Sequence, residues 1–252
     1  MTWCPTGLAT FLPLHAAGDY DHPGLRASDY VVSSYTPMLS PLLDSTPLPL
    51  NPDSRMLLIN QHETPGFPKL PGTVKEIEHI VGHIKNKVQH SLLLGEQATV
   101  AAVLKEMQEH DSVHFACHAS QEIVEPTKTG IHLHDGTLDL ATLNQQPYKS
   151  RSLAFLSACQ TAQGDPRLPD EAIHLGAALL MTGYPTVIAT MWSVGDGDAP
   201  HVAERFYGHL IEDRGTENGN AGRALHQAVA ALRDSFRDNK FSQWVQYIHI
   251  GS

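Results

Sequence analysis

Short apolar segments alternate with amphipathic ones along most of this chain, and that alternation constrains the fold most. The apolar runs are bounded by turn residues, as is typical of buried strands; they cover 55–60, 91–94, 112–117, 153–158, 186–192 and 244–250. Longer segments with apolar residues at helical spacing lie between them, at 71–88, 99–107, 171–182, 199–211 and 221–236. The pattern predicts an α/β fold in which helices cover both faces of a mostly parallel sheet.

Two segments depart from this alternation. Residues 1–53 are rich in Pro and Gly, and the prolines between Pro37 and Pro52 forbid a long helix there. Because 252 residues suffice for one large core, we expect a single domain over 1–252, with 1–53 packed on it as an N-terminal part. The pair Asp135-Gly136 between two short apolar runs predicts a small β-hairpin insertion.

Charge and cysteine content exclude several classes of protein. The chain has 17 Lys and Arg against 27 Asp and Glu, a net charge of −10, so we expect no direct binding of nucleic acid. Its three cysteines are far apart and odd in number, which favours a reducing compartment. The longest apolar span, 177–189, is too short to cross a bilayer, and residues 1–20 contain no Lys or Arg. A cytoplasmic protein without membrane contact is the expectation.

Two predicted strands end in residues that can carry out chemistry. The strand at 112–117 leads into His118, and the strand at 153–158 leads into Cys159. Functional groups gather at the carboxyl ends of strands in open parallel sheets, so neighbouring strands would bring both side chains to one edge. An imidazole beside a thiol can take its proton and produce the nucleophilic thiolate of a Cys–His hydrolase. The alternative is that both residues only pack, as we expect for Cys117 inside its strand.

These segments also resemble a known family. His-Phe-Ala-Cys-His-Ala at 114–119 and Leu-Ser-Ala-Cys-Gln-Thr-Ala at 156–162 resemble the two signature segments of CHAT domains. CHAT domains are caspase-like domains related to separase and are commonly found behind tetratricopeptide repeats. Weaker resemblances follow in the same order as in the family, at 35–37, 70–72, 94–99, 183–194 and 244–251.

The resemblance implies a caspase-like fold and a cysteine endopeptidase of the caspase–separase type. By position, His118 is the catalytic histidine and Cys159 the nucleophile, and the backbone N–H groups of Ala119 and Cys159 are the oxyanion donors. Most relatives have Gly where this chain has Ala119. Because alanine resists a positive φ, we expect the oxyanion loop to differ in shape.

Substrate contacts are expected just beyond the strand that ends near Trp192. The separase relatives cleave after Arg, which an acidic residue in that region holds, and this chain offers Asp196 and Asp198 there. A carboxylate suits a guanidinium through a bidentate pair. Trp192, Asp196 and Asp198 are therefore the candidate substrate-binding residues. The alternative is that the two Asp residues cap the following helix.

Other candidate sites have simpler explanations. His79 and His83 share a helix face but lack the carboxylate or cysteine partners of a metal site, and His132 and His134 are interpreted as structural. Asp170 and Glu171 are expected to begin a helix, with substrate contact as the alternative. No glycine-rich phosphate-binding motif occurs. We therefore predict neither a metal nor a cofactor.

The leading hypothesis is a regulated peptidase module of a larger signalling or immune protein. Its partners would be a protein or peptide substrate and a tetratricopeptide-repeat region, in cis or in trans. The chain would be cut from a longer repeat-containing protein, and a short natural product is the alternative. Two alternatives remain open: a catalytically silent CHAT pseudo-enzyme that acts as a protein-interaction module, and a Cys–His acyltransferase or other thiol hydrolase.

Overall fold

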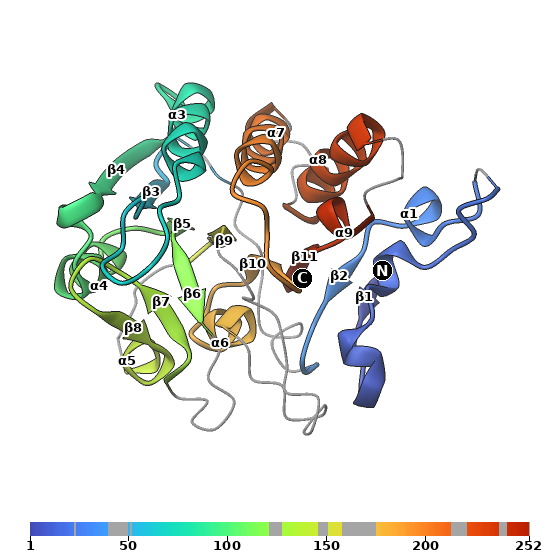
Figure 1. Cartoon of the computed structure of the whole chain (residues 1–252), viewed down its shortest axis with the longest axis horizontal. Coiled ribbons are helices and arrows are strands. Elements are labelled where there is room, and N and C mark those ends of the chain that lie inside the picture. The colour runs from blue at the N-terminus through green and yellow to red at the C-terminus, as the bar shows by residue number, and fades with distance from the viewer. Residues whose placement is uncertain are drawn as a thin grey trace.

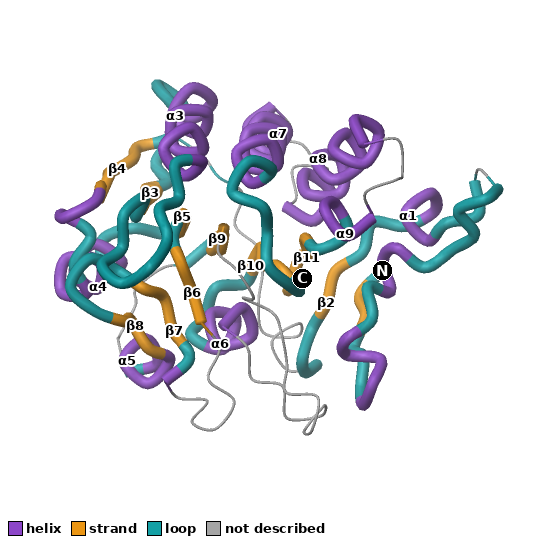
Figure 2. Tube along the Cα trace, viewed as in Figure 1, coloured by secondary structure: helices purple, strands orange, loops and turns teal. Residues whose placement is uncertain are grey.

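An eight-stranded sheet forms the centre of the computed structural model, which describes residues 1–22, 24–39, 50, 52–120, 128–145, 151–157, 175–212, 221–236 and 241–251 (Figures 1 and 2). The strand order is β1-β2-β11-β10-β9-β5-β3-β4. The bounds are β1 Thr2–Trp3, β2 Ser34–Tyr35, β3 Arg55–Asn60, β4 Gln89–Leu94, β5 Ser112–Ala116, β9 Leu153–Ser157, β10 Thr186–Thr190 and β11 Tyr247–Gly251. Only the pair β10–β11 is antiparallel among these strands, so the sheet is mostly parallel, as predicted.

Helices cover both faces of the sheet. In the view of Figure 1, three long helices lie above it: α3 Gly72–Ile84, α7 Ala199–Glu212 and α8 Ala221–Phe236, with the short α9 Phe241–Trp244 beside α8. On the opposite face lie α4 Val100–Met107, α5 Leu140–Asn144 and α6 Leu175–Met181. A second, three-stranded antiparallel sheet joins this face, with β6 His118–Ser120, β7 Gly130–His132 and β8 Thr137–Asp139.

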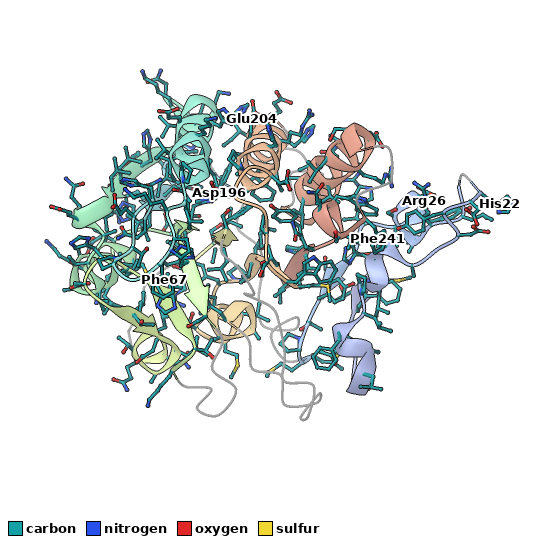
Figure 3. All side chains as sticks on the ribbon, viewed as in Figure 1. His22, Arg26, Phe67, Asp196, Glu204 and Phe241 are labelled. Atoms are coloured by element: carbon teal, nitrogen blue, oxygen red, sulfur yellow. The ribbon has the colours of Figure 1, made fainter. Side chains whose placement is uncertain are left out.

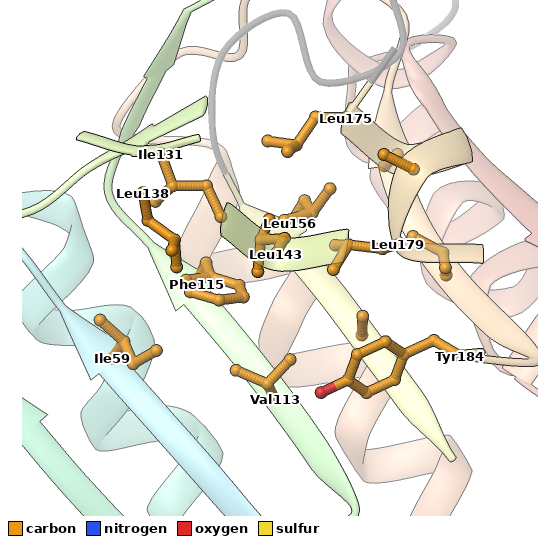
Figure 4. Packing of buried hydrophobic residues seen from close by; sticks show 14 of the residues in the cluster. Ile59, Val113, Phe115, Ile131, Leu138, Leu143, Leu156, Leu175, Leu179 and Tyr184 are labelled. Atoms are coloured by element: carbon orange, nitrogen blue, oxygen red, sulfur yellow. The ribbon is translucent and has the colours of Figure 1, made fainter. Parts of the chain in front are cut away.

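The central strands β3, β5, β9 and β10 are mostly apolar because each one contributes side chains to two cores. Along β3, Leu57 and Ile59 enter the core under α4, α5 and α6, and Met56 and Leu58 enter the core under α3, α7 and α8. The period-2 alternation of side chains sends neighbours to opposite faces, so a strand covered on both sides reads as one continuous apolar run. Figure 4 shows the first core, where Phe115 of β5 lies among residues of the small sheet and α5.

One buried polar group interrupts the second core. The His114 ring of β5 is buried, with Nδ1 3.1 Å from the Tyr207 hydroxyl of α7 and Nε2 3.1 Å from Glu76 Oε1 of α3. Burial, and then the charge of Glu76, raises the pKa of the Tyr207 hydroxyl well above its usual value, so this hydroxyl stays protonated. The three side chains tie α3 and α7 to β5.

The N-terminal part forms one edge of the sheet. Its strand β2 pairs in parallel with β11, and β1 extends the sheet by one more strand. His15 places Nδ1 2.8 Å from the Tyr35 hydroxyl and Nε2 2.8 Å from the carbonyl oxygen of Val245. His249 of β11 places Nδ1 2.7 Å from Ser34 Oγ. Residues 1–35 are therefore joined to the rest of the fold by strand pairing and by the hydrogen bonds of His15 and His249.

Most expected elements are present, with differences at their ends. Within the Pro- and Gly-rich N-terminal part, α1 covers Ala27–Tyr30 and Ser34–Tyr35 form the short strand β2. The hairpin at 130–139 forms, but its connection runs from Leu133 to Gly136, where the Leu133 N–H donates to the Gly136 carbonyl. The last strand begins at Tyr247 because α9 occupies the residues before it. The predicted helix at 171–182 is described only from Leu175.

Candidate active site

The carboxyl ends of β5 and β9 define the site, because the two strands are parallel neighbours. Their register pairs Ala116 with Ser157. His118 follows Ala116 by two residues, and Cys159 follows Ser157 by the same number. Cys159, with Asp170 and Glu171, lies outside the described residues.

His118 is held in one orientation by a backbone carbonyl. Its Nε2 lies 2.8 Å from the carbonyl oxygen of Pro68. A carbonyl can only accept, so the N–H is on Nε2 and that nitrogen donates. In the neutral ring the proton is therefore absent from Nδ1, which has no hydrogen-bond partner among the described residues. Nδ1 is the nitrogen that can act as a base.

The Pro68 carbonyl is presented by a folded loop, 61–70, which follows β3. The Gln61 N–H donates to the Ala116 carbonyl at 2.9 Å and so extends the β3–β5 pairing into the loop. The Leu70 N–H donates to the His62 carbonyl at 2.8 Å, which closes the loop on itself. Gly66 turns the chain with a φ of 84°, a conformation that L side chains rarely adopt. The loop thus bends back from β3 to reach His118.

Ala119 adopts ordinary strand geometry. It lies in β6, opposite Ile131 of β7. Among the described residues, Asn86 is the only non-glycine with a positive φ, so Ala119 does not need the conformation that glycine would favour. The alanine is compatible with the backbone here.

The three candidate substrate-binding residues lie in the segment between β10 and α7, and Figure 3 labels Asp196. The Asp196 carboxylate accepts a hydrogen bond from the Gly72 N–H at 2.7 Å, at the start of α3. A carboxylate is favoured there because unpaired N–H groups and the helix dipole make a helix N-terminus positive. The Trp192 indole N–H donates to the Ser242 carbonyl at 3.0 Å. The Asp198 N–H donates to the Gly195 carbonyl at 2.9 Å within a tight turn.

His118 also has neighbours that the sequence analysis did not assign to the site. The Phe67 ring lies against both His118 and His132, and His132 stands opposite His118 in the β6–β7 register. Phe67 and Pro68 were overlooked because they are in a loop some 50 residues before His118. His132 was interpreted as structural, although its alternation with His134 along a predicted strand signalled a shared face.

Two further properties bear on function. Within the described ranges, no three or more His, Cys, Asp or Glu side chains come together in a way that could hold a metal ion. No described helix has the length and apolar character needed to span a membrane.

Three solved structures of cysteine peptidases are similar to this chain. The Arg-specific cysteine proteinase gingipain R matches at 12% identity with a TM-score of 0.60, over 87% of this chain and 54% of that one. A complex of the pro- and mature domains of Porphyromonas gingivalis RgpB matches at 11% with a TM-score of 0.61, over 89% and 56%. The separase–securin complex of Saccharomyces cerevisiae matches at 16% with a TM-score of 0.58, over 88% of this chain and 14% of that one.

At these identities the likeness concerns the fold alone, which is the caspase-like fold of a cysteine peptidase. This chain spans about half of the gingipain chain and a small part of the separase chain. A search among curated proteins finds no match. The family model for the CHAT domain matches residues 1–252. This chain belongs to the CHAT domain family.

Proposed function

We propose that this chain is a cysteine endopeptidase with a Cys159–His118 dyad. The observation that carries the proposal is the hydrogen bonding of His118: its Nε2–H donates to the Pro68 carbonyl, and Nδ1 has no hydrogen-bond partner among the described residues. The next parallel strand leads to Cys159 at the same edge of the sheet. Nδ1 would take the Cys159 proton, the thiolate would attack the scissile carbonyl, and the imidazolium would return the proton to the leaving amine. Water then hydrolyses the acyl-enzyme. The N–H groups of Ala119 and Cys159 would stabilise the oxyanion.

The substrate proposal is an Arg residue before the scissile bond. Asp196 and Asp198 would supply carboxylates for its guanidinium, and gingipain R, which shares the fold, is Arg-specific. Asp196 already accepts a hydrogen bond from Gly72, which leaves its second oxygen to contact substrate. Asp196→Asn keeps an oxygen for Gly72 but removes the charge. We expect it to raise KM for Arg peptides with little change in kcat, and an unchanged KM would assign Asp196 to helix capping alone.

The partner proposal is a regulatory protein region, with tetratricopeptide repeats as the first candidate, in a cytoplasmic signalling or immune assembly. Separase, which shares the fold, is solved in complex with securin, a protein partner. A regulated module would be silent until its partner arrives, so peptidase assays need both the isolated chain and the chain with a repeat region supplied in trans.

The experiment uses a peptide electrophile carrying Arg next to an acyloxymethyl ketone. The thiolate displaces the carboxylate from the methylene carbon beside the ketone, so the C–O bond breaks and a stable thioether forms at Cys159. We expect labelling in the native chain and none in Cys159→Ser or His118→Ala. Labelling that is indifferent to the peptide sequence would favour another thiol hydrolase or acyltransferase. No labelling, with or without a repeat region, would favour the silent interaction module.

A further inference from the structure

The rings of His118, Phe67 and His132 form a row with Phe67 in the middle. The Phe67 ring lies 5.1 Å from His118, centroid to centroid, at an interplanar angle of 29°. The same ring lies 4.3 Å from His132 at 30°. Figure 3 labels Phe67 at the edge of the small sheet. One phenyl ring therefore contacts both histidines.

His132 is the fixed member of this stack. Its Nδ1 lies 3.0 Å from Thr137 Oγ1 of β8, and its Nε2 lies 2.8 Å from Ser120 Oγ of β6. Both ring nitrogens are therefore in use, and turning the ring would break two hydrogen bonds. Burial, and then the charge of His118, lowers the pKa of His132, which favours its neutral form beside a protonated His118. His132 is thus built to stay in place and uncharged.

Burial alone does not explain why position 67 holds a phenylalanine. Its side chain is 40% exposed, so the gain from removing apolar area from water is incomplete. What its position does provide is a flat face for His118. Stacking restricts the imidazole to the plane in which Nε2 reaches Pro68, and the face of an aromatic ring attracts a cation such as the imidazolium.

We infer that Phe67 and His132 are positioning residues for the peptidase reaction: His132 fixes the Phe67 ring, and Phe67 holds the His118 ring with Nδ1 directed away from Pro68. This inference rests on the proposed function, because it assumes that His118 activates Cys159. Neither residue is required to touch the substrate.

The test compares Phe67→Leu, Phe67→Tyr and His132→Gln with the native chain. Phe241→Leu is the matched control, because Phe241 is 39% exposed and contacts Tyr20 and Trp244 edge to face, away from His118. The first readout is the rate of Cys159 alkylation by iodoacetamide at pH 6, relative to that of the exposed Cys4 in the same molecule. We expect a loss on the order of 10- to 100-fold for Phe67→Leu and His132→Gln, since small misplacements of a reacting group cost this much. Phe67→Tyr keeps the ring and should stay within about threefold of native, as should the control.

A second readout separates this inference from the proposed function. In the native chain the Phe67 ring current shifts the His118 Cε1–H resonance, and Phe67→Leu should remove that shift while Phe241→Leu leaves it. If native Cys159 reacts no faster than Cys4, the proposed function fails. The His118 Cε1–H resonance then tests by itself whether Phe67 positions the His118 ring. An unmoved resonance, or a fast native Cys159 that Phe67→Leu leaves fast, would overturn the inference. A kcat loss with KM preserved in a peptide assay supports positioning, and a rise in KM alone assigns Phe67 to substrate contact.

Discussion

Acid should weaken the attachment of the N-terminal part through His249 and His15. Burial lowers the pKa of each imidazole to about 4 from its ordinary value near 6.5; at His15 the Val245 carbonyl opposes this shift and His226 adds to it. The unfolded chain therefore binds more protons than the folded one between these values. The contribution of these two histidines to the free energy of unfolding is fully present above pH 6.5. It is lost as the pH falls from 6.5 toward 4.

The size of the effect follows from the two pKa values. At pH 5, an imidazole with a pKa near 6.5 unfolded and about 4 folded costs about 2 kcal/mol relative to pH 8. His249 and His15 together cost about 4 kcal/mol, a large fraction of the stability of an ordinary domain. Both histidines contact residues 34–35, so the lost free energy weakens the contact between the N-terminal part and β11.

The assay is urea unfolding followed by tryptophan fluorescence at pH 8 and pH 5. His249→Gln keeps a polar group beside Ser34 but cannot titrate, so the pH 8 to pH 5 difference in unfolding free energy should shrink by about 2 kcal/mol. His201→Gln, at an exposed position of α7, is the control and should leave the difference unchanged. If His249→Gln also leaves the pH 8 to pH 5 difference in unfolding free energy unchanged, burial does not lower the pKa of His249 and the prediction is refuted.

Three further predictions test hydrogen bonds and packing contacts within the fold. Tyr207→Phe leaves Nδ1 of the buried His114 unpaired and should cost about 1–3 kcal/mol in urea unfolding, and a cost below about 0.5 kcal/mol would contradict the network. Gly72→Ala would place a Cβ 2.0 Å from the Asp196 carbonyl oxygen and should destabilise by about 1–3 kcal/mol. Gly82→Ala, where a Cβ meets nothing within 4 Å, should instead stabilise α3, and two changes of equal sign would refute the assigned contact. Thr99→Ala removes the hydroxyl that accepts from the Ala102 N–H and should lower the melting temperature by an amount equivalent to about 1 kcal/mol, whereas an unchanged melting temperature would remove Thr99 as the cap of α4.

The sheet could be predicted from sequence because its strands are buried on both faces. Runs such as 55–60 and 153–157 have no polar face, so their apolar character marks them directly. The start of α4 could be predicted as well, because the helical pattern at 99–107 begins at Thr99 and side-chain capping is a local interaction with a fixed spacing. The candidate dyad followed from strand order and the family resemblance.

The surroundings of His118 could not be predicted in the same way. The group that fixes its proton is the carbonyl of Pro68, and a backbone carbonyl leaves no mark in a sequence. Phe67 and His132 meet His118 through a loop and a second sheet whose register depends on the whole fold. The role of Asp196 at α3 joins residues 124 positions apart, so sequence alone could only name substrate contact and helix capping as alternatives.

A cysteine endopeptidase of this kind requires that His118 activate Cys159. The direct measurement is the pH dependence of Cys159 alkylation by iodoacetamide, resolved by mass spectrometry, in the native chain and in His118→Ala, with Cys4 as the exposed reference thiol. An unperturbed thiol titrates near ~8.5 and reacts slowly at pH 6. We predict rapid labelling of Cys159 at pH 6 that collapses in His118→Ala while Cys4 is unaffected. Equal, slow labelling of Cys159 and Cys4 at pH 6 in both proteins would contradict the dyad.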